Sequence, residues 1–258
     1  MKRLPTAIAS LFLAATSTQA QQPELGNRRL SPEDVRTVAP ALEKYTQERV
    51  LGDVWRRPGL SRRDRSIVTL AALIARNQTI DLPGYLAMAL ENGVKPREVS
   101  EIITHLAFYS GWGNAMSAIA VAKEVFTRRD IGPDQRPAAS GQLLPLNEAA
   151  EADRAKRVGE QFGAMFPGVA QYTTDLLFRE LWLRPDLAPR DRSLITIGAL
   201  VANGQVAQLT GHIPIGMNNG LTQAEIAEAI THLAFYVGWP NVFSAMPVAK
   251  DAFEKRGK

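Results

Sequence analysis

The hexapeptide Thr-His-Leu-Ala-Phe-Tyr occurs twice in the chain, at residues 104–109 and again at residues 231–236. An offset of 127 residues separates the two copies, and the same offset, with no gap, relates many other positions. They include Arg63-Asp64-Arg65-Ser66 with Arg190-Asp191-Arg192-Ser193, Trp55 with Trp182, Trp112 with Trp239, and Tyr45 with Tyr172. Coincidence does not align so many residues at one offset, so the sequence contains a duplicated unit. Two copies are too few for a solenoid, and they predict a fused pseudo-dimer with an approximate two-fold axis inside one chain.

The two copies occupy about residues 31–128 and 158–256. Residues 129–157 lie between them and include the turn-forming stretch Gly132-Pro133-Asp134, which is typical of a linker. The chain has 258 residues and a hydrophobic content of 45%, the composition of an ordinary globular protein that can bury a substantial core.

Within each unit, apolar residues recur at the spacing of helices. Ser61 is a candidate N-cap with Asp64 three residues later, and apolar side chains then follow at helical spacing up to Ile74. Thr222 and Glu225 form a better capping box in the second unit. Further helices are expected at about residues 81–91, 96–109 and 114–128, with a break at Gly111-Trp112-Gly113. No segment alternates with the period of two typical of strands, so the predicted fold class is all-α.

The first twenty residues have the order of a secretory signal peptide. Met1-Lys2-Arg3 is a basic start, an apolar run covers residues 7–15, and Thr18-Gln19-Ala20 ends in the small residue that signal peptidase requires. The apolar run is too short to span a bilayer as a mature helix, and a frayed amphipathic helix is the alternative interpretation. We expect a mature chain that starts at Gln21, has no membrane span and is secreted or periplasmic.

The composition argues against several classes of function. Cysteine is absent, which rules out disulfides, thiolate metal sites and cysteine nucleophiles. The chain has three histidines, His105, His212 and His232, which makes a histidine-rich zinc site hard to build, and no metal is expected. The formal charge of +4 is modest, and no basic cluster has aromatic residues interleaved with it, so nucleic-acid binding has little support.

The pattern His-Leu-Ala-Phe-Tyr-x-Gly-Trp, preceded by Asn-Gly and followed by Ala-Lys, resembles the carboxymuconolactone decarboxylase family. The resemblance covers both units and implies a duplicated alkylhydroperoxidase-D-like helical bundle. Members with one unit per chain form rings of several subunits, so the resemblance implies a homo-oligomer in which three two-unit chains complete a six-unit ring. The family includes decarboxylation of 4-carboxymuconolactone and reduction of peroxides by a Cys-x-x-Cys-x-x-x-His helix, so the resemblance fixes the fold more firmly than the reaction.

Departures from the peroxidase motif restrict the reaction. When His212 is set on the histidine of that motif, the two cysteine positions fall on Gln205 and Gln208. Glutamine has no sulfur that can cycle through sulfenic acid, so thiol peroxidase activity is excluded. In the first unit the histidine position falls on Tyr85, which favours one site per chain, in the second unit.

A decarboxylase of this family needs groups that anchor carboxylates, stabilise negative charge on a carbonyl oxygen and protonate carbon. His212 is the candidate acid or base, because an unperturbed histidine titrates near pH ~6.5. Gln208 and Gln205, expected one and about two helical turns before it, could donate to a substrate oxygen, and Tyr85 could donate a phenolic hydrogen bond. No cofactor is expected, because the lactone itself accepts the electron pair. For His212, a partly buried packing role is the alternative.

Two stripes of polar side chains recur at a spacing of four residues along one helix flank: Glu101, His105 and Tyr109, and their equivalents Glu228, His232 and Tyr236. Each stripe could be a catalytic relay or a structural contact between units or subunits. Its recurrence in both units, where Tyr85 and His212 differ, favours architecture.

Four arginines lie in the first turn of a helix, where the helix dipole disfavours cations: Arg63, Arg65, Arg190 and Arg192. Binding of a substrate carboxylate, for example by Arg192, is one explanation, and salt bridges to Asp64, Asp191 or a neighbouring helix are the favoured one. Trp112 and Trp239 are expected to plug the core at the helix break. The other interpretation is that they wall a pocket, which would make Trp239 a substrate contact.

Two functions from different classes remain open. The first is an exported, cofactor-free lyase that acts on a small lactone or carboxylic acid. The second is a catalytically silent helical oligomer that binds a small molecule or a protein. Export argues against the usual role of the family, which is intracellular, but we favour the enzyme.

Overall fold

The computed structural model describes residues 30–256, and the predicted signal peptide lies outside this part of the chain. Twelve α-helices, joined by short 3-10 and π-helical turns, make up the described part, and no strand occurs in it. The all-α prediction is therefore confirmed. None of the helices between residues 30 and 256 is long and apolar enough to cross a membrane.

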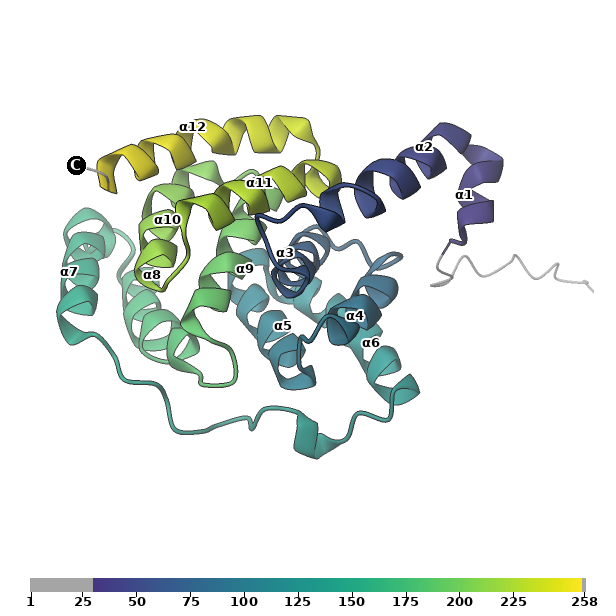
Figure 1. The fold of residues 1–258 in the computed structure, drawn as a ribbon. Coiled ribbons are helices and arrows are strands. Elements are labelled where there is room, and N and C mark those ends of the chain that lie inside the picture. Colours follow the sequence, from purple (N-terminus) through teal and green to yellow (C-terminus); the bar gives the residue numbers. More distant parts are fainter. Residues whose placement is uncertain (1–29, 257–258) are drawn as a thin grey trace, which may run out of the picture.

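The first unit consists of an N-terminal arm followed by four longer helices (Figure 1). The arm comprises α1 (Pro32–Val38), α2 (Pro40–Tyr45) and the turns η1 (Thr46–Leu51) and η2 (Val54–Arg56). The longer helices are α3 (Arg62–Ala75), α4 (Leu82–Glu91), α5 (Pro96–Ser110) and α6 (Trp112–Arg128).

The second unit repeats this order after the turn η3 (Pro133–Gln135). Its N-terminal part comprises α7 (Glu148–Val158), η4 (Gly159–Gly163), α8 (Pro167–Tyr172), η5 (Thr173–Phe178) and η6 (Leu181–Leu183). Its longer helices are α9 (Pro189–Ala202), α10 (Leu209–Asn218), α11 (Gln223–Val237) and α12 (Trp239–Arg256), with the turn η7 (Val206–Gln208) before α10. Figure 1 shows α1 and α2 extending from the helical body on one side and α7 lying on the other.

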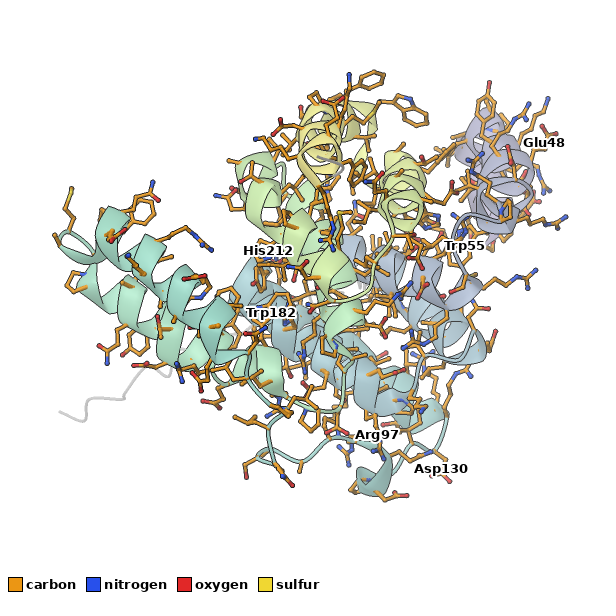
Figure 2. The ribbon with its side chains drawn as sticks, turned by 60° about the vertical axis from the view of Figure 1, so that its left-hand side comes forward. Glu48, Trp55, Arg97, Asp130, Trp182 and His212 are labelled. Carbon is orange, nitrogen blue, oxygen red and sulfur yellow. The ribbon has the colours of Figure 1, made fainter. Side chains whose placement is uncertain are left out.

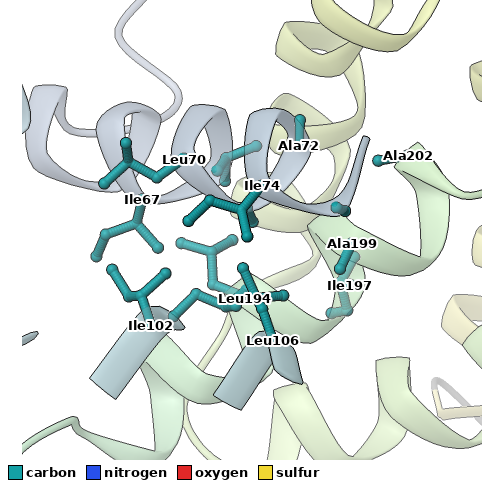
Figure 3. Close-up of a cluster of buried hydrophobic side chains, with 14 of the residues drawn as sticks. Ile67, Leu70, Ala72, Ile74, Ile102, Leu106, Leu194, Ile197, Ala199 and Ala202 are labelled. Atoms are coloured by element: carbon teal, nitrogen blue, oxygen red, sulfur yellow. The ribbon is translucent and has the colours of Figure 1, made fainter. Parts of the chain in front are cut away.

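The central contact of the molecule pairs two equivalent helices, α3 and α9. A Cβ atom added at Gly198 of α9 would lie 3.3 Å from the Cβ atom of Ala71, the residue that precedes it by one repeat length. Around this crossing lies a shared hydrophobic core to which α3, α5 and α9 contribute Ile67, Leu70, Ile102, Leu106, Leu194 and Ile197 (Figure 3). Equivalent residues that face each other are the mark of an isologous contact, as the pseudo-two-fold interpretation requires.

Ion pairs at the start of α3 and α9 follow the same reciprocity. Arg63 donates to Asp191 at 2.7 Å, and Arg190 donates to Asp64 at 2.9 Å. Each arginine also binds a glutamate of its own unit, Glu98 or Glu225. The cations in these first helical turns are thus stabilised by carboxylates of both units, as the salt-bridge interpretation proposed.

Most helix boundaries follow the local signals in the sequence. The Thr222 hydroxyl accepts from the Glu225 amide at 3.1 Å while the Glu225 carboxylate accepts from the Thr222 amide at 2.8 Å, a complete capping box. Ser61 accepts from the Asp64 amide at 3.0 Å. Gly111 ends α5 with a φ of +92°, a conformation in which a side chain would be strained.

The expectation that Trp112 and Trp239 plug the core is wrong. Because α6 and α12 begin immediately after Gly111 and Gly238, each tryptophan is the first residue of its helix. Their relative exposures are 61% and 51%, and each ring packs edge-on against a phenylalanine of the preceding helix. The predicted start at residue 114 is therefore two residues late.

The segment predicted as a linker is only partly irregular. Its residues 148–157, together with Val158, form α7, which is capped by the Asn147 side chain, an acceptor from the Ala150 amide at 3.1 Å. The irregular part is fastened to the second unit, since Arg184 donates to the carbonyl oxygens of Ala138 and Ala139 at 3.0 and 2.9 Å. Residues of α7 and of α10 both line the site described next.

Candidate functional site

The polar stripe of α5 lies against α9 and η6 of the other unit. Glu101 is fully buried and accepts from Arg192 at 2.7 Å and from Arg184 at 2.6 Å. Burial raises the pKa of Glu101, but the hydrogen bonds and charges of Arg184 and Arg192 outweigh it, so its pKa is lowered. Glu101 is therefore an ionised structural counter-ion between the units.

His105, one turn further along α5, is also fully buried. Its Nε2 lies 2.8 Å from the Thr196 hydroxyl, which itself donates to the Arg192 carbonyl oxygen at 2.8 Å. Because that hydroxyl proton is already used, Nε2 carries the proton and donates it to Thr196. Burial, with the nearby Arg192 charge, lowers the pKa of His105 well below its usual value, so the ring is neutral and fixed in one tautomer.

The stripe of α11 makes the reciprocal contact with α3. Glu228 accepts from Arg65 at 2.8 Å and from Arg57 at 2.8 Å. His232 Nε2 lies 2.8 Å from the Thr69 hydroxyl, and burial lowers the pKa of His232 to about 3. Both stripes are thus contacts between the two units, one of the two interpretations left open by the sequence.

The third residue of each stripe, Tyr109 or Tyr236, lies next to the position at which the two units differ. Trp182 Nε1 donates to the Tyr109 hydroxyl at 2.9 Å, and Trp55 Nε1 donates to the Tyr236 hydroxyl at 2.7 Å. Beyond Tyr236 lies Tyr85, which accepts a hydrogen bond from the Tyr236 hydroxyl at 3.1 Å. Beyond Tyr109 lies His212. We call these places the Tyr85 site and the His212 site.

His212 belongs to α10 and lies among aromatic rings. It stacks on Trp182, with ring centroids 6.1 Å apart and an angle of 14°, and it meets Tyr109 edge-on at 5.4 Å. Its Nδ1 is buried without a hydrogen-bond partner in the described part of the chain. Burial lowers the pKa of His212 to about 4, so the imidazole is neutral near pH 7. Figure 2 shows His212 close to Trp182, with Trp55 of the other site well away from them.

A cleft of about 920 Å³ opens in front of His212. The walls come from α10, from η5 and η6, and from the segment 144–158 that contains α7. Polar groups along it include Gln208, Asn219 and Arg154, whereas Trp182, Phe178 and Ile215 supply apolar surface. A hollow of this size with a few convergent polar groups has the character of a small-molecule site.

The structure brings together only some of the residues that the sequence singled out. His212 and Gln208 both line the cleft, and Tyr109 touches His212 from below the surface. Gln205 does not line it, because Gly204, with a φ of +68°, and the turn η7 interrupt the helix that was expected to carry both glutamines. Arg192 is fully buried on Glu101, Tyr85 belongs to the other site, and Trp239 is exposed at the start of α12; none of the three lines the cleft.

Sequence reasoning missed the residues of the cleft wall opposite α10. Arg154 and Glu151 of α7 lie in the segment predicted as a linker, and Phe178 of η5 lies in a part of the second unit to which no function was assigned. A signal was present, since Asn147 followed by Glu148, Glu151, Arg154 and Arg157 has an N-cap and charges at helical spacing. Among residues 30–256, no group of three or more potential ligands could hold a metal ion.

Comparison with known proteins gives two matches to one family model. The model for the carboxymuconolactone decarboxylase family matches residues 40–124 and 167–251, which are offset by the repeat length. The 4-carboxymuconolactone decarboxylase of Acinetobacter baylyi is 39% identical over 84 residues, which are 33% of this chain and 63% of that protein. The nitrosuccinic acid decarboxylase of Metarhizium robertsii is 36% identical over 77 residues, 30% of this chain and 54% of that protein.

The matched segments thus span less than two thirds of each of these relatives. The two family matches, by contrast, cover most of the described chain and contain both polar stripes, both central helices and both divergent positions, Tyr85 and His212. Since each match coincides with one copy of the repeat, the chain belongs to the carboxymuconolactone decarboxylase family and carries two units of it in tandem.

Proposed function

We propose that the protein is a cofactor-free carboxy-lyase of the 4-carboxymuconolactone decarboxylase type and that its reaction takes place in the cleft at His212. The observation that carries the proposal is the neutral imidazole at the wall of this cleft, whose buried Nδ1 has no hydrogen-bond partner among residues 30–256. Two relatives named as decarboxylases support the reaction class.

The reaction needs no cofactor if the substrate holds its own electron acceptor. Cleavage of the bond between the carboxylate carbon and its neighbour releases carbon dioxide and leaves the electron pair on that neighbour, conjugated with the acceptor group. A proton must then be added to the carbanion carbon. Gln208, at the cleft wall, can donate an amide hydrogen bond to the acceptor oxygen on which negative charge grows.

His212 can supply the proton although burial lowers its pKa to about 4. An anionic substrate next to the ring favours the imidazolium, so substrate binding raises the pKa of His212 and draws a proton into the site. The imidazolium then lies beside the carbon at which negative charge develops. Transfer of its proton to that carbon returns the ring to its neutral form.

We also propose that the chain assembles with itself, as the ring expected from the resemblance requires. Apolar side chains at helical spacing stand exposed on equivalent faces of two helices: Trp112, Met116 and Ile119 on α6, and Trp239, Phe243 and Met246 on α12. Exposed patches of this kind mark interaction surfaces. Light scattering should give a trimer that Phe243→Glu dissociates, whereas a stable monomer of the unaltered chain at micromolar concentration would contradict this assembly.

Export by residues 1–20 remains part of the proposal. Expression of the full chain in a bacterium with a periplasm should yield a mature form that begins at Gln21 in the periplasmic fraction. Recovery of the chain with Met1 intact, in the cytoplasm alone, would refute it.

The activity is tested by carbon dioxide release from a panel of small acids that carry an electron acceptor, including 4-carboxymuconolactone and nitrosuccinate. We expect turnover of at least one acid by the purified chain and its loss in His212→Gln. The second candidate function, a silent oligomer, is favoured by the same exposed faces of α6 and α12. Absence of turnover across the panel, in a chain that still binds these acids or assembles, would support that alternative.

A further inference from the structure

One turn of α10 at the cleft wall lacks a hydrogen bond that α-helices ordinarily make. Pro214 lies in the interior of α10, which continues past it to Asn218. In an α-helix, the N–H group of residue 214 would donate to the carbonyl oxygen of residue 210. Proline has no N–H group, and its ring crowds that carbonyl. The Thr210 oxygen is therefore left without its regular donor and is tilted away from the helix axis.

This oxygen lies at the surface of the cleft. Thr210, Gly211 and Pro214 all line the cleft, so it borders this turn from the first residue to the last. Gly211 presents backbone alone, and a Cβ atom added there would meet nothing within 4 Å beyond its chain neighbours and the backbone of α10. The Thr210 hydroxyl is already used, since it donates to the Ala207 carbonyl oxygen at 2.8 Å. Because a helical carbonyl points towards the residue four positions later, the Thr210 oxygen points from one lining residue towards the other.

The unpaired carbonyl is close to His212. With a rise of about 1.5 Å per residue, Thr210 and Pro214 are about 6 Å apart along the helix axis, and His212 lies between them in height. His212 lines the same cleft. A small ligand in contact with the imidazole is therefore within reach of the carbonyl oxygen.

The chemistry of a carbonyl oxygen decides which group it binds. It accepts hydrogen bonds and cannot donate one, so it disfavours a carboxylate and favours a hydroxyl or an N–H group. The charged side chains that line the cleft are Glu151, Arg154 and Arg157, which together carry one positive charge. This charge disfavours an ammonium group, so an uncharged hydroxyl is the matching donor.

The free carbonyl belongs to the second unit and is not repeated in the first. By the repeat offset, Pro214 corresponds to Ala87 of α4, which has the N–H group that proline lacks. A second proline in a helix interior, Pro247 of α12, corresponds to Ala120 and does not line the cleft. A proline in a helix interior is destabilising, and α10 has one at the turn that faces the cleft, which is typical of a functional position.

We propose that the Thr210 carbonyl oxygen, left free by Pro214, accepts a hydrogen bond from a hydroxyl group of the substrate, so that the cleft prefers small hydroxy acids to the same acids without a donor. The inference rests on the proposed function, since the carboxylate of the same molecule is the group lost at His212. Pro214 is in this sense a specificity residue and takes no part in proton transfer.

The test measures binding without turnover. Probes are monocarboxylates of about four to six carbons with one hydroxyl on carbon 2 or carbon 3, and for each the acid in which fluorine replaces that hydroxyl. Fluorine is similar in size and leaves the charge unchanged, but it cannot donate a hydrogen bond. Calorimetry should show at least one hydroxy acid binding about threefold or more tightly than its fluoro analogue, as expected for one hydrogen bond.

Substitution of Pro214 should remove this preference. Pro214→Ala restores the N–H group and so pairs the Thr210 oxygen within α10, and Pro214→Val does the same while it keeps apolar bulk at the cleft wall. In both variants the two members of each probe pair should bind within about twofold of each other. Pro247→Ala is the matched control, since it restores an N–H group in a helix outside the cleft and should keep the preference.

The same variants guard against loss of the fold. Pro214→Ala and Pro247→Ala should both raise the melting temperature, because each removes a proline from a helix interior. A loss of preference in Pro214→Ala is then a loss of the acceptor and not of the structure.

The inference is overturned if no probe binds, if hydroxy and fluoro acids bind alike, if the preference survives in both Pro214 variants, or if Pro247→Ala also abolishes it. Failure of the proposed function would look different. In that case, no acid would lose carbon dioxide, whereas the preference for a hydroxyl group and its dependence on Pro214 would persist.

Discussion

The His212 site and the Tyr85 site are built on the same frame, and within residues 30–256 they differ chiefly at one ring and at one helix, α7. In both, a tryptophan donates to a tyrosine of the other unit, and a glutamate, a histidine and an arginine lie below them. At the Tyr85 site, the Tyr85 hydroxyl accepts a hydrogen bond from the Tyr236 hydroxyl. At the His212 site, Nδ1 of the ring has no hydrogen-bond partner in the part of the chain that the structure describes, and a cleft lined in part by α7 opens beside the ring.

The comparison separates architecture from chemistry. What recurs in both units is the set of buried ion pairs and hydrogen bonds between them, and it holds the pseudo-dimer together. What differs is the titratable ring and the charge around it, which faces a cleft large enough for a small acid. The contact between the units is therefore common to both copies, whereas the proposed reaction has its site in one of them.

The largest expected effect is on turnover. His212→Gln keeps the approximate size and polarity of the ring but cannot transfer a proton, so we expect a loss of about 10²- to 10⁴-fold in kcat. Tyr85→Phe removes one hydroxyl at the other site and should change kcat by less than about threefold. Both variants must be compared at matched melting temperature. Equal losses in the two variants would mean that the sites are not chemically distinct.

The next effect concerns stability, and we expect a loss from substitution of either inter-unit glutamate, Glu101 or Glu228. Glu101→Gln removes the counter-ion of the fully buried Arg192, which should cost about 3–5 kcal/mol in the free energy of unfolding. Glu228→Gln should cost less, because its second partner Arg57 is 45% exposed whereas Arg184 is 15% exposed. Urea unfolding measures both. A cost at Glu228 that exceeds the cost at Glu101 would contradict this ranking of burial.

Acid should destabilise the protein before its carboxylates titrate. Burial lowers the pKa of His212 to about 4 and that of His232 to about 3, and it places the pKa of His105 well below 6.5. Below about pH 6.5 the histidines bind protons in the unfolded chain but not in the folded chain, so the free energy of unfolding falls as pH falls. The pKa of Glu101, Glu225 and Glu228 is also lowered, so these carboxylates add to the loss only below about pH 4.5.

Melting temperatures measured between about pH 7 and about pH 5 check the histidine contribution. The decrease should become shallower in His105→Gln and His232→Gln, each compared with the unaltered chain. A melting temperature that is constant over this range would show that the buried rings are not held neutral.

The smallest effect distinguishes the helix caps of the two units. Thr222→Ala removes the hydroxyl half of a capping box, which bonds both the amide and the carboxylate of Glu225, and should cost about 1 kcal/mol in the free energy of unfolding. Ser61→Ala removes the single bond to the Asp64 amide and should cost less. Thermal unfolding of the two variants gives the comparison, and a larger cost at Ser61 would count against it.

The arrangement of two equivalent helical units could be predicted from the sequence because the sequence of one unit is repeated in the other. The offset between Thr104 and Thr231 is enough to predict two equivalent units, and the capping signals at Ser61 and Thr222 predict where their helices begin. The reciprocal pairing of Arg63 with Asp191 also follows from a two-fold arrangement of like segments. Periodicity and local signals are properties of short stretches of chain, and they can be read without knowledge of packing.

The candidate site could be predicted less completely from the sequence, and the reasons are physical. Trp112 and Trp239 are exposed because nothing in the described part of the chain covers that face of their helices. The hydrophobicity of a tryptophan does not show which face of the fold it lies on. The position of Gln205 depends on a turn at Gly204 that interrupts an expected helix. The low pKa of His212 arises from rings contributed by both units, and the role of α7 depends on how residues 138–147 run along the second unit.

The most direct test of the central claim is an NMR titration of the three imidazoles, with His212→Gln used to assign the His212 signal. In the empty protein, all three rings should be neutral at about pH 6, with the pKa of His212 near 4. Addition of a small carboxylic acid that binds the cleft should raise the pKa of His212 and leave His105 and His232 unchanged. A His212 pKa near 6.5 that does not respond to the acid, or an equal response of all three rings, would contradict the account.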